Sequence, residues 1–410
     1  MNKREMKSLV LYPYPMEYDG QSLQGHYLLK GLKENGEDAV ACSRYNQEDK
    51  KVFYEKYKPD VVFGIGFWGD VPELVSHPLA NKMTPVPWLN ANGCVFNYHA
   101  LLNSLPLILA TSNWVKATYI RDGIKPDNIH VAPIGYDPEI FYSRQSYDPE
   151  VRRMRKEVLE IEDDELMILT AGGDVTSKGA QEMIKAIAKV QDKLPKWKYV
   201  LKIWPSKSAR EHGRDEEKLI AELGLDPDKF IYLSEKYDPH KMSLLLNSCD
   251  IYAAPSRIEG FGMIQLEAQA CGKPVISIDV GGPRDTIIPN ETGFLADVES
   301  EIKLNSEWVS KRMGFETRHR IKFPEPKTFA YRANIDQLAE SLVKLATDSK
   351  LRNKMGKAAA QHAYDTFNYR ITAKHIADLV KKYVLKEKQA VSRPIDNPVH
   401  SFITKRVYQR

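Results

Sequence analysis

Short apolar segments alternate with amphipathic segments twice along this chain of 410 residues. In the first half, the apolar segments are 8–12, 39–43, 61–65, 86–90, 107–110 and 129–132. In the second half, they are 166–170, 199–204, 230–233, 251–254 and 274–278. Strands that alternate with helices are typical of βαβ units and a parallel sheet. The pattern therefore predicts an α/β protein with two consecutive doubly wound sheets.

A polar and charged stretch, 137–164, lies between the two alternating regions and is typical of a domain connection. We expect an N-terminal domain over 1–150 and a C-terminal domain over 151–366. A last helix is expected over 367–388, followed by a basic tail, 389–410. The alternation breaks after residue 295, and 299–333 is predicted to leave the sheet as a long loop or a short hairpin.

The overall charge and the cysteines exclude several classes of protein. The net charge of +4 is small for this length and argues against a dedicated nucleic-acid binder. The four cysteines are far apart and form no CxxC pair, so they suggest neither a disulfide framework nor a zinc site. The apolar run behind the basic N-terminus is too short for a signal peptide. We expect a cytoplasmic protein, with attachment to the inner membrane surface left open.

The most informative segment is 255–268, which follows the predicted strand 251–254. Ligands bind at the carboxyl ends of strands in open parallel sheets. Gly260 and Gly262 allow a tight turn and a close approach to a ligand. The next helix is predicted to begin near Met263, where its free N–H groups suit a diphosphate.

Two carboxylates flank the start of this helix. Glu259 precedes it, and Glu267 lies just over one turn inside it. The two oxygens of Glu267 can accept both hydroxyls of a ribose, which would place Glu259 near a sugar. A capped amphipathic helix with solvated glutamates is the alternative interpretation.

A second segment, 169–179, also runs from a predicted strand through small residues into a helix. Lys178, near the first helical turn, can neutralise a leaving diphosphate as a glycosidic bond breaks. The spacing is neither that of GxGxxG nor that of a Walker loop. A solvated lysine in a turn is the alternative interpretation.

Other polar segments also follow predicted strands. In 18–26, Gly20 can offer a backbone N–H to a ligand, and His26 is a candidate base, although a histidine on a helix surface is the favoured interpretation. The turns at 90–93 and 279–285 can contact sugar hydroxyls or be ordinary turns. The basic segment 318–322 and the tail can contact anionic lipid or an acidic acceptor, or simply be solvated.

These segments together resemble family 4 of the retaining glycosyltransferases, which have the GT-B fold. Glu259 and Glu267 match the Glu-x7-Glu signature of that family, and the similarity continues through 270–276, 281–282 and 290–294. A weaker similarity covers 172–179, the Gly20 loop and the closing helices. The resemblance implies two Rossmann-like domains that face each other across a cleft, with the last helix crossing back onto the first domain.

The resemblance also implies what the cleft binds. A nucleotide-sugar donor would lie there, held mostly by the second domain, and the acceptor would attack from the face that the leaving group occupies. No divalent metal and no further cofactor are expected, and no metal-ligand cluster is visible in the sequence. The implied contacts to the diphosphate are Lys178 and the backbone amides of Gly262, Met263 and Ile264. Glu267 would hold the ribose, Glu259 would lie beside the donor sugar, and Gly20 would approach from the first domain.

The sequence departs from the family pattern at several positions. Asp174 stands where the family often has an arginine, so Lys178 would need help from Lys202 or Lys207. In the first domain, Gln24 replaces a frequent histidine, and Asn90 and Asn92 stand where many members have His or Asp. These changes concern the sugar and the acceptor more than the nucleotide.

The sequence therefore predicts a retaining glycosyltransferase of the hexosyltransferase type with a UDP- or GDP-linked donor. A glycan, a lipid-linked molecule or a small molecule would be its acceptor. An epimerase or a phosphorylase of the same fold is an alternative, although no motif for a pyridoxal phosphate lysine is found. A non-catalytic nucleotide-sugar-binding or scaffold protein is a third possibility. The presence of Lys178, Glu259 and Glu267 together argues against it.

Overall fold

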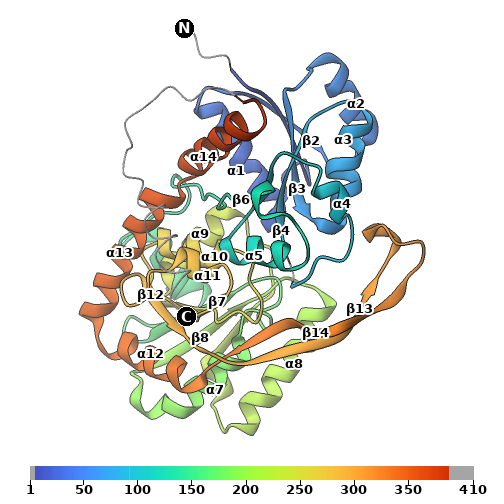
Figure 1. The fold of residues 1–410 in the computed structure, drawn as a ribbon. Coiled ribbons are helices and arrows are strands. Elements are labelled where there is room, and N and C mark those ends of the chain that lie inside the picture. The colour runs from blue at the N-terminus through green and yellow to red at the C-terminus, as the bar shows by residue number, and fades with distance from the viewer. Residues whose placement is uncertain (1–4, 92, 387–410) are drawn as a thin grey trace. The chain divides into compact units, whose positions relative to one another are not determined.

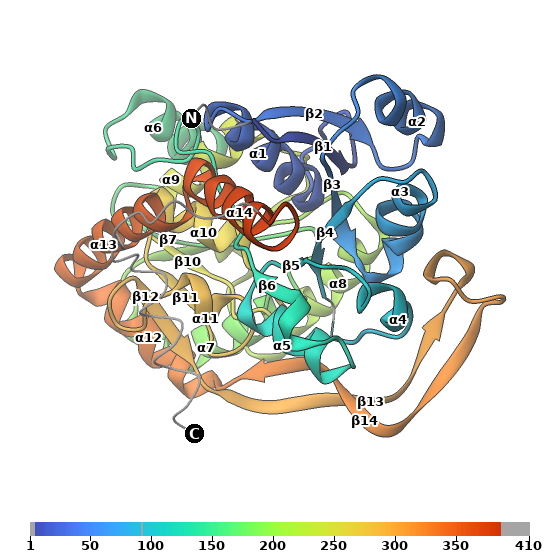
Figure 2. The ribbon, with the colours of Figure 1, turned by 45° about the horizontal axis from the view of Figure 1, so that its top comes forward.

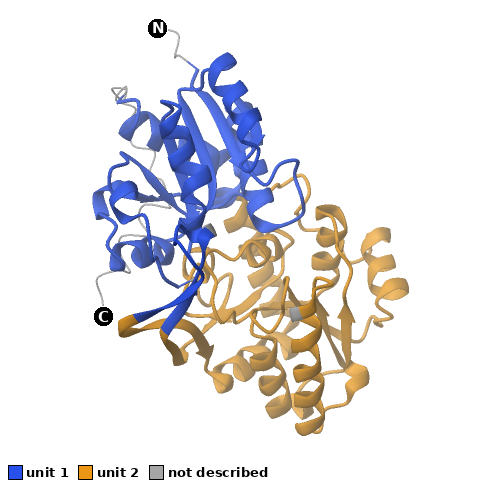
Figure 3. Ribbon diagram, turned by 90° about the vertical axis from the view of Figure 1, so that its right-hand side faces the viewer, with its two compact units in different colours: residues 1–136, 306–322, 365–410 blue, residues 137–305, 323–364 orange. Residues whose placement is uncertain are grey.

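The computed structural model describes residues 5–91 and 93–386. Their contacts define two compact units, coloured separately in Figure 3. The first unit consists of the chain up to residue 136, residues 306–322 and the chain from residue 365 onward. The second consists of 137–305 and 323–364. The domain limits expected from the sequence, with a boundary after residue 150, stay a prediction. The basic tail, 389–410, and Asn92 lie outside the described residues.

The first unit contains a six-stranded, all-parallel sheet with the strand order β2-β1-β3-β4-β5-β6 (Figures 1 and 2). Its strands are β1 (Lys7–Tyr12), β2 (Asp38–Ser43), β3 (Val61–Phe67), β4 (Pro85–Asn90), β5 (Ile108–Ala110) and β6 (Ile129–Val131). Its α-helices are α1 (Gly20–Glu34), α2 (Gln47–Lys56), α3 (His77–Ala80), α4 (His99–Leu102), α5 (Asn113–Arg121) and α14 (Tyr369–Tyr383). All six strands expected in this half are present.

The second unit contains another six-stranded parallel sheet, with the order β12-β11-β10-β7-β8-β9. Its strands are β7 (Leu166–Ala171), β8 (Trp197–Lys202), β9 (Phe230–Leu233), β10 (Ile251–Ala253), β11 (Val275–Ile278) and β12 (Gly293–Ala296). Its main helices are α6 (Pro149–Arg153), α7 (Ala180–Val190), α8 (Lys207–Glu222), α9 (Pro239–Ser248), α10 (Met263–Ala270), α11 (Pro283–Thr286) and α12 (Ile335–Thr347), and α13 (Ser349–Phe367) follows them. The sequence analysis did not predict β12.

The strand order of the second sheet fixes where a ligand can bind. Read from β9, the order along the sheet is third, second, first, fourth, fifth and sixth, as in dinucleotide-binding domains. The chain leaves β7 toward one edge and returns at β10 to build the other. Ligands of open α/β sheets bind at such a switch point, beyond the carboxyl ends of the strands. The topology therefore directs attention to the loops that follow β7 and β10.

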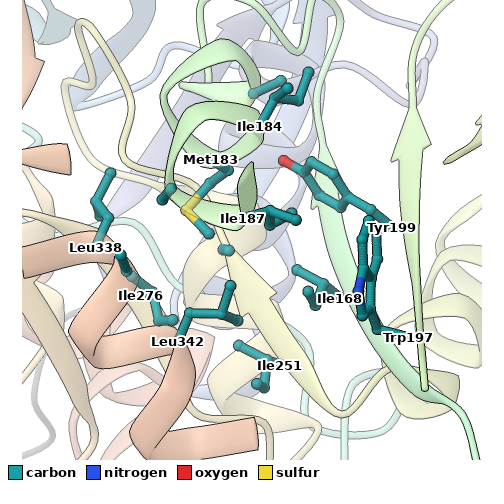
Figure 4. Close-up of a cluster of buried hydrophobic side chains, with 14 of the residues drawn as sticks. Ile168, Met183, Ile184, Ile187, Trp197, Tyr199, Ile251, Ile276, Leu338 and Leu342 are labelled. Atoms are coloured by element: carbon teal, nitrogen blue, oxygen red, sulfur yellow. The ribbon is translucent and has the colours of Figure 1, made fainter. Parts of the chain in front are cut away.

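One face of the second sheet is buried under a single apolar cluster. Side chains from the strands, among them Ile168, Tyr199 and Ile251, pack against α7 and α12, which contribute Ile187 and Leu342 (Figure 4). Along β8, alternate residues point to opposite faces of the sheet. Tyr199 and Leu201 belong to this cluster. Val200 and Lys202 therefore face the other side.

The segment 299–333 is the largest departure from expectation. It was predicted as a long loop or a short hairpin, but it forms a long hairpin of β13 (Val298–Val309) and β14 (His319–Ala333), which pair only with each other. Near the tip, Asn97 Nδ2 donates to Met313 O at 3.1 Å, and Met313 and Phe315 pack on the apolar core of the first unit. The base of the hairpin belongs to the second unit.

Two expectations from composition can be compared with the structure. All four cysteines carry free thiols. Within residues 5–91 and 93–386, no helix combines the length and the apolar character that a membrane span requires.

Helix α14 returns to the first unit and packs along α1, as both ribbon views show. Gly31 of α1 allows this contact, because a Cβ there would lie 2.5 Å from Ala373 Cβ and 2.6 Å from Tyr369 O. The rings of Tyr27 and Tyr369 stack beside it, with their centroids 6.4 Å apart. The end of the chain therefore completes the unit in which the chain begins.

The pair Gly31→Ala and Gly213→Ala tests this packing. Gly213 lies in α8, and a Cβ at this position would have no atom within 4 Å. We expect Gly31→Ala to lower the free energy of unfolding by about 1–3 kcal/mol through overpacking. Gly213→Ala should raise it by about 0.5–1 kcal/mol through helix propensity alone. Urea denaturation measures both, and wild-type stability in Gly31→Ala would show that α14 does not pack this closely on α1.

Candidate functional site

The loops that follow β7 and β10 lie in direct contact at the carboxyl edge of the second sheet. Arg257 N donates to Ser177 O at 2.9 Å, which joins the two backbones. Gly179 has a φ of +85°, and a Cβ there would lie 2.3 Å from Pro255 O. Only glycine satisfies both conditions, because other residues rarely adopt this φ and would collide with the neighbouring backbone. The sequence therefore holds the two loops together at the switch point of the sheet.

Two sequence-predicted site residues meet across these loops. Lys178 Nζ lies 2.5 Å from Glu259 Oε2, and both side chains are partly exposed. The stem of Lys178 crosses Gly172, where a Cβ would lie 2.7 Å from Lys178 Cγ. The ammonium of Lys178 is thereby held at the edge of the sheet. There it pairs with Glu259, which it can leave for another negatively charged group.

Helix α10 begins beside this ion pair. Gly262, its N-cap residue, has a φ of +97°, which favours glycine. The first turn of a helix presents backbone N–H groups without intrahelical partners, and here these belong to Met263 and Ile264. Such a terminus binds phosphate through its N–H groups and its dipole.

A third loop braces the approach to α10. Gly282 N donates to Glu259 O at 2.9 Å. A Cβ at Gly282 would lie 2.2 Å from Phe261 Cα, and one at Gly281 would lie 2.5 Å from Glu259 O. The backbone of Glu259 is therefore fixed by two glycines that leave room for it.

Glu267 lies inside α10, and its side chain is buried, with 4% of the residue exposed. Burial raises the pKa of its carboxyl to about 8. No residue in the described part of the chain pairs with this carboxyl through a hydrogen bond or an ion pair. A buried carboxyl without a partner weakens the folded state, and such groups are frequent at functional sites.

The loop that carries Lys178 is held from behind by polar contacts that the sequence analysis missed. Asp174 Oδ2 lies 2.6 Å from His212 Nδ1, and Thr176 Oγ1 donates to Glu216 Oε1 at 2.6 Å. Glu216 is fully buried, and burial raises the pKa of its carboxyl to about 7. Asp174, which stands where the family that the sequence resembles often has arginine, thus has a structural role here.

The loop that carries Glu259 is anchored by a second missed cluster. Glu182 Oε1 forms ion pairs with Arg257 at 3.1 Å and with Arg332 at 3.2 Å. Tyr331 N donates to Arg257 O at 2.7 Å, so the base of β14 is attached to the same loop. These contacts join segments far apart in sequence, so no local sequence motif predicts them.

The two lysines expected to support Lys178 differ in their surroundings. Lys202, at the end of β8, is buried, with 4% exposed. Lys207 is exposed at the start of α8 and lies 3.6 Å from Glu211. Of the two lysines, only Lys202 is buried at the carboxyl edge of the sheet, where the loops with Lys178 and Glu259 lie.

Gly20 belongs to the first unit, so its predicted part in the site stays a prediction. It is the first residue of α1, where Asp19 Oδ1 accepts from Gln21 N at 2.9 Å and from Ser22 N at 3.1 Å. The Asp19 carboxylate therefore occupies two of the N–H groups at this helix terminus. Gln24 Oε1 accepts from Asn90 Nδ2 at 3.4 Å, which links two positions where the sequence departs from the family pattern.

No group of three or more His, Cys, Asp and Glu side chains is arranged to hold a metal ion in the described part of the chain.

The family model described as "Glycosyl transferases group 1" matches residues 151–322. The chain is 26% identical over 304 residues to a D-inositol 3-phosphate glycosyltransferase of Stackebrandtia nassauensis, a match that covers 73% of this chain and 57% of the relative. It is 26% identical over 188 residues to an MMP alpha-(1->4)-mannosyltransferase of Mycolicibacterium hassiacum, covering 45% of this chain and 40% of that one. The chain spans about half the length of the curated relatives it matches.

Solved structures share the fold over most of the chain. A glycosyltransferase from Rickettsia africae superposes with a TM-score of 0.71 at 18% identity, covering 94% of this chain and all of that one. The Anabaena protein HepE, solved in complex with UDP and glucose, gives a TM-score of 0.69 at 15% identity, covering 92% of this chain and all of that one. These likenesses identify the two Rossmann-like sheets as those of the GT-B fold.

The burial of Glu267 predicts a change in how stability depends on pH. A carboxyl with a pKa of 4.5 when unfolded and about 8 when folded stabilises the protein fully below pH 4.5 and loses that contribution as the pH rises to about 8. Each pKa unit corresponds to about 1.4 kcal/mol. We expect Glu267→Gln to lose less thermal stability than the wild type between pH 5 and pH 8.

The control is Glu340→Gln, which changes an exposed glutamate of α12. This variant should show the same dependence of thermal stability on pH as the wild type. Every variant should retain part of that dependence, because burial also raises the pKa of Glu216. Melting curves at several pH values measure the effect. Equal slopes in the wild type and Glu267→Gln would show that the carboxyl is not buried as described.

Proposed function

We propose that this chain transfers a sugar from a UDP- or GDP-linked donor to an acceptor, with retention at the anomeric carbon, because residues 151–322 match the family model of the group 1 glycosyl transferases. The observation that carries the proposal is the meeting of a lysine, a helix N-terminus and a buried carboxyl at the switch point of the second sheet. They are Lys178, the first turn of α10 and Glu267.

Each of these groups suits one part of a nucleotide-sugar. The N–H groups of Met263 and Ile264 and the ammonium of Lys178 are donors and positive charge for a diphosphate. Glu267 accepts hydrogen bonds from the two ribose hydroxyls. Glu259 lies beside Lys178 and the start of α10. It accepts hydrogen bonds from hydroxyls of the donor sugar once Lys178 turns to the phosphate.

The proposed reaction needs a leaving group that can carry charge. The bond between the anomeric carbon and the phosphate oxygen breaks, and the acceptor oxygen bonds to that carbon on the same face. The acceptor proton passes to the departing phosphate oxygen, so that the charges balance. Negative charge grows on the diphosphate as the bond breaks, and Lys178 with the α10 terminus stabilises it more in the transition state than in the ground state.

The names of the similar proteins support a sugar transfer of this kind. The relatives are named for transfer to inositol phosphate and for mannosyl transfer, and HepE was solved with UDP. We propose the nucleotide-sugar donor for this chain on that ground together with the site chemistry. No divalent metal enters the proposed mechanism.

The first test is binding and slow hydrolysis with a panel of UDP-, GDP- and ADP-sugars. One of the UDP- or GDP-sugars should bind and be slowly hydrolysed by the wild type. Lys178→Ala should lower the rate by about 10²- to 10³-fold, since it removes a charge that acts in the transition state, and should change the Kd less. Lys207→Ala is the control, because that lysine is exposed at the start of α8.

The outcomes separate the proposal from its alternatives. If no nucleotide-sugar binds, a scaffold role replaces the proposed activity. Release of free nucleotide from a bound donor, with an isomerised sugar and no acceptor, would indicate an epimerase.

Donor binding should also release a proton from Glu267. Its pKa of about 8 means that it is protonated at pH 7, whereas hydroxyl donors favour the charged carboxylate and lower that pKa. Calorimetric titration with a nucleotide-sugar in two buffers of different ionisation enthalpy should give a release of up to about one proton at pH 7.

Glu267→Gln should bind the same donor more weakly and release no proton. Proton release that persists in Glu267→Gln would remove this glutamate from the ribose contact while leaving the glycosyltransferase proposal intact.

A further inference from the structure

Lys202 is a buried cation at the carboxyl edge of the second sheet. It is the last residue of β8, and 4% of it is exposed. In residues 5–91 and 93–386, no carboxylate and no hydrogen-bond acceptor pairs with its ammonium. The contact that the structure gives Nζ is the face of Tyr237, whose ring centroid lies 5.4 Å away.

A charge in this position weakens the folded state. Moving an ammonium out of water is costly unless it is paired, and a cation–π contact returns only part of that cost. Burial, together with the nearby charge of Lys241, lowers the pKa of Lys202 to about 8, so the group is still mostly protonated at pH 7. A buried donor that lacks an acceptor in the protein suits an acceptor on a ligand.

The neighbouring lysine provides a contrast. Lys241 Nζ lies 4.0 Å from the same ring centroid, but it is also 2.8 Å from Glu235 Oε2. Its charge is therefore balanced on the surface. Lys202 has no such carboxylate, although both lysines lie beside Tyr237.

Lys202 lies on the same face of the sheet as the proposed ribose contact. Alternation along β8 places it opposite the apolar cluster that packs under α7 and α12. Tyr252 of β10 also lies outside that cluster, and so do the buried side chains Leu266 and Ala268 of α10. The helix that carries Glu267 therefore lies on the face that Lys202 shares.

The order of the strands places Lys202 beyond the diphosphate. The loops with Lys178 and Glu259 follow β7 and β10, and β8 is the next strand outward, about 5 Å further along the sheet. Lys202 O accepts from Gly172 N at 3.0 Å, so its backbone is fixed beside the Lys178 loop. Because β7 and β8 lie on the side of β10 away from β11, this part of the edge is within reach of the base of a nucleotide whose diphosphate lies at α10.

We propose that Lys202 donates a hydrogen bond to a carbonyl oxygen of the nucleobase and so selects uracil or guanine over cytosine and adenine. This inference rests on the proposed function and adds a specificity-determining residue to it. Uracil and guanine carry a carbonyl where cytosine and adenine carry an amino group. The ammonium of Lys202 attracts the carbonyl oxygen and repels the amino group. Tyr237 offers an aromatic surface beside Lys202.

The test compares UDP with CDP, which differ at one exocyclic group, and GDP with ADP. Calorimetry gives the Kd of each for the wild type, Lys202→Met and Lys241→Met. Methionine keeps the length and the apolar stem and removes the charge. The wild type should bind UDP or GDP at least about tenfold more tightly than its amino counterpart, as expected for a charge-assisted hydrogen bond.

In Lys202→Met this ratio should fall to within about threefold, because the tight ligand loses affinity and the weak one does not. Lys241→Met should keep the wild-type ratio. A melting temperature no lower than that of the wild type establishes that each variant is folded, and Lys202→Met should melt higher because it removes an unpaired buried charge. A wild-type ratio in Lys202→Met overturns the proposal, and so does an equal loss of affinity for all four nucleotides, which would assign Lys202 to the phosphates.

Glu267→Gln distinguishes failure of this inference from failure of the proposed function. Suppose that the wild type binds a nucleotide, that Glu267→Gln weakens this binding, and that Lys202→Met keeps the wild-type base preference. The proposed nucleotide site is then supported, and the proposed role of Lys202 is wrong. If the wild type binds none of the four nucleotides, both proposals fail.

Discussion

The close approach of three loop backbones at the carboxyl edge of the second sheet is the constraint on which the candidate site depends. Gly179 lies against Pro255, and Gly281 and Gly282 lie against the backbone from Glu259 to Phe261. A methyl group at any of these glycines would overlap the neighbouring main chain. The orientation of Lys178 and Glu259 follows from this contact, since each is fixed to a loop that cannot shift independently. Such fixed geometry spares a reaction the entropy of ordering its catalytic groups.

Two kinds of buried charge lie close to that edge, and they differ in how they are neutralised. Glu182 is buried between Arg257 and Arg332, which satisfy its carboxylate. Glu267 and Lys202 are buried on one face of the sheet without a partner of opposite charge among the described residues. A chain selected for stability alone would replace these two groups with apolar side chains. Their burial supports the proposal that groups on a ligand take the place of the missing partners.

The sequence predicted the fold where the signal was local and buried. Strands such as Leu166–Ala171 lie where the apolar segments placed them, because every residue of this strand is buried. The hairpin of β13 and β14 was underestimated because few residues of its strands are buried and the two strands form a sheet of their own. Strand β12 is short and begins with a glycine, so it resembled a turn.

The same distinction applies to the site. Lys178, Glu259 and Gly262 were singled out because they follow predicted strands at short spacing, and the structure has them at those strand ends. The contacts that hold their loops could not be predicted. The pairs of Asp174 with His212 and of Glu182 with Arg332 join residues that no local pattern connects. The burial of Lys202 likewise depends on Tyr237, which belongs to another strand connection.

The return of α14 onto α1 has a consequence for how the protein is made. A ribosome releases the six strands of the first sheet early, but the helix that covers α1 emerges only after the whole second unit has been synthesised. Until then, the face of α1 around Tyr27 and Gly31 has no α14 to cover it. The second unit, by contrast, has all of its segments by residue 364. The unit that begins the chain is therefore the last to be finished, and during translation its exposed face is a natural place for a chaperone to bind.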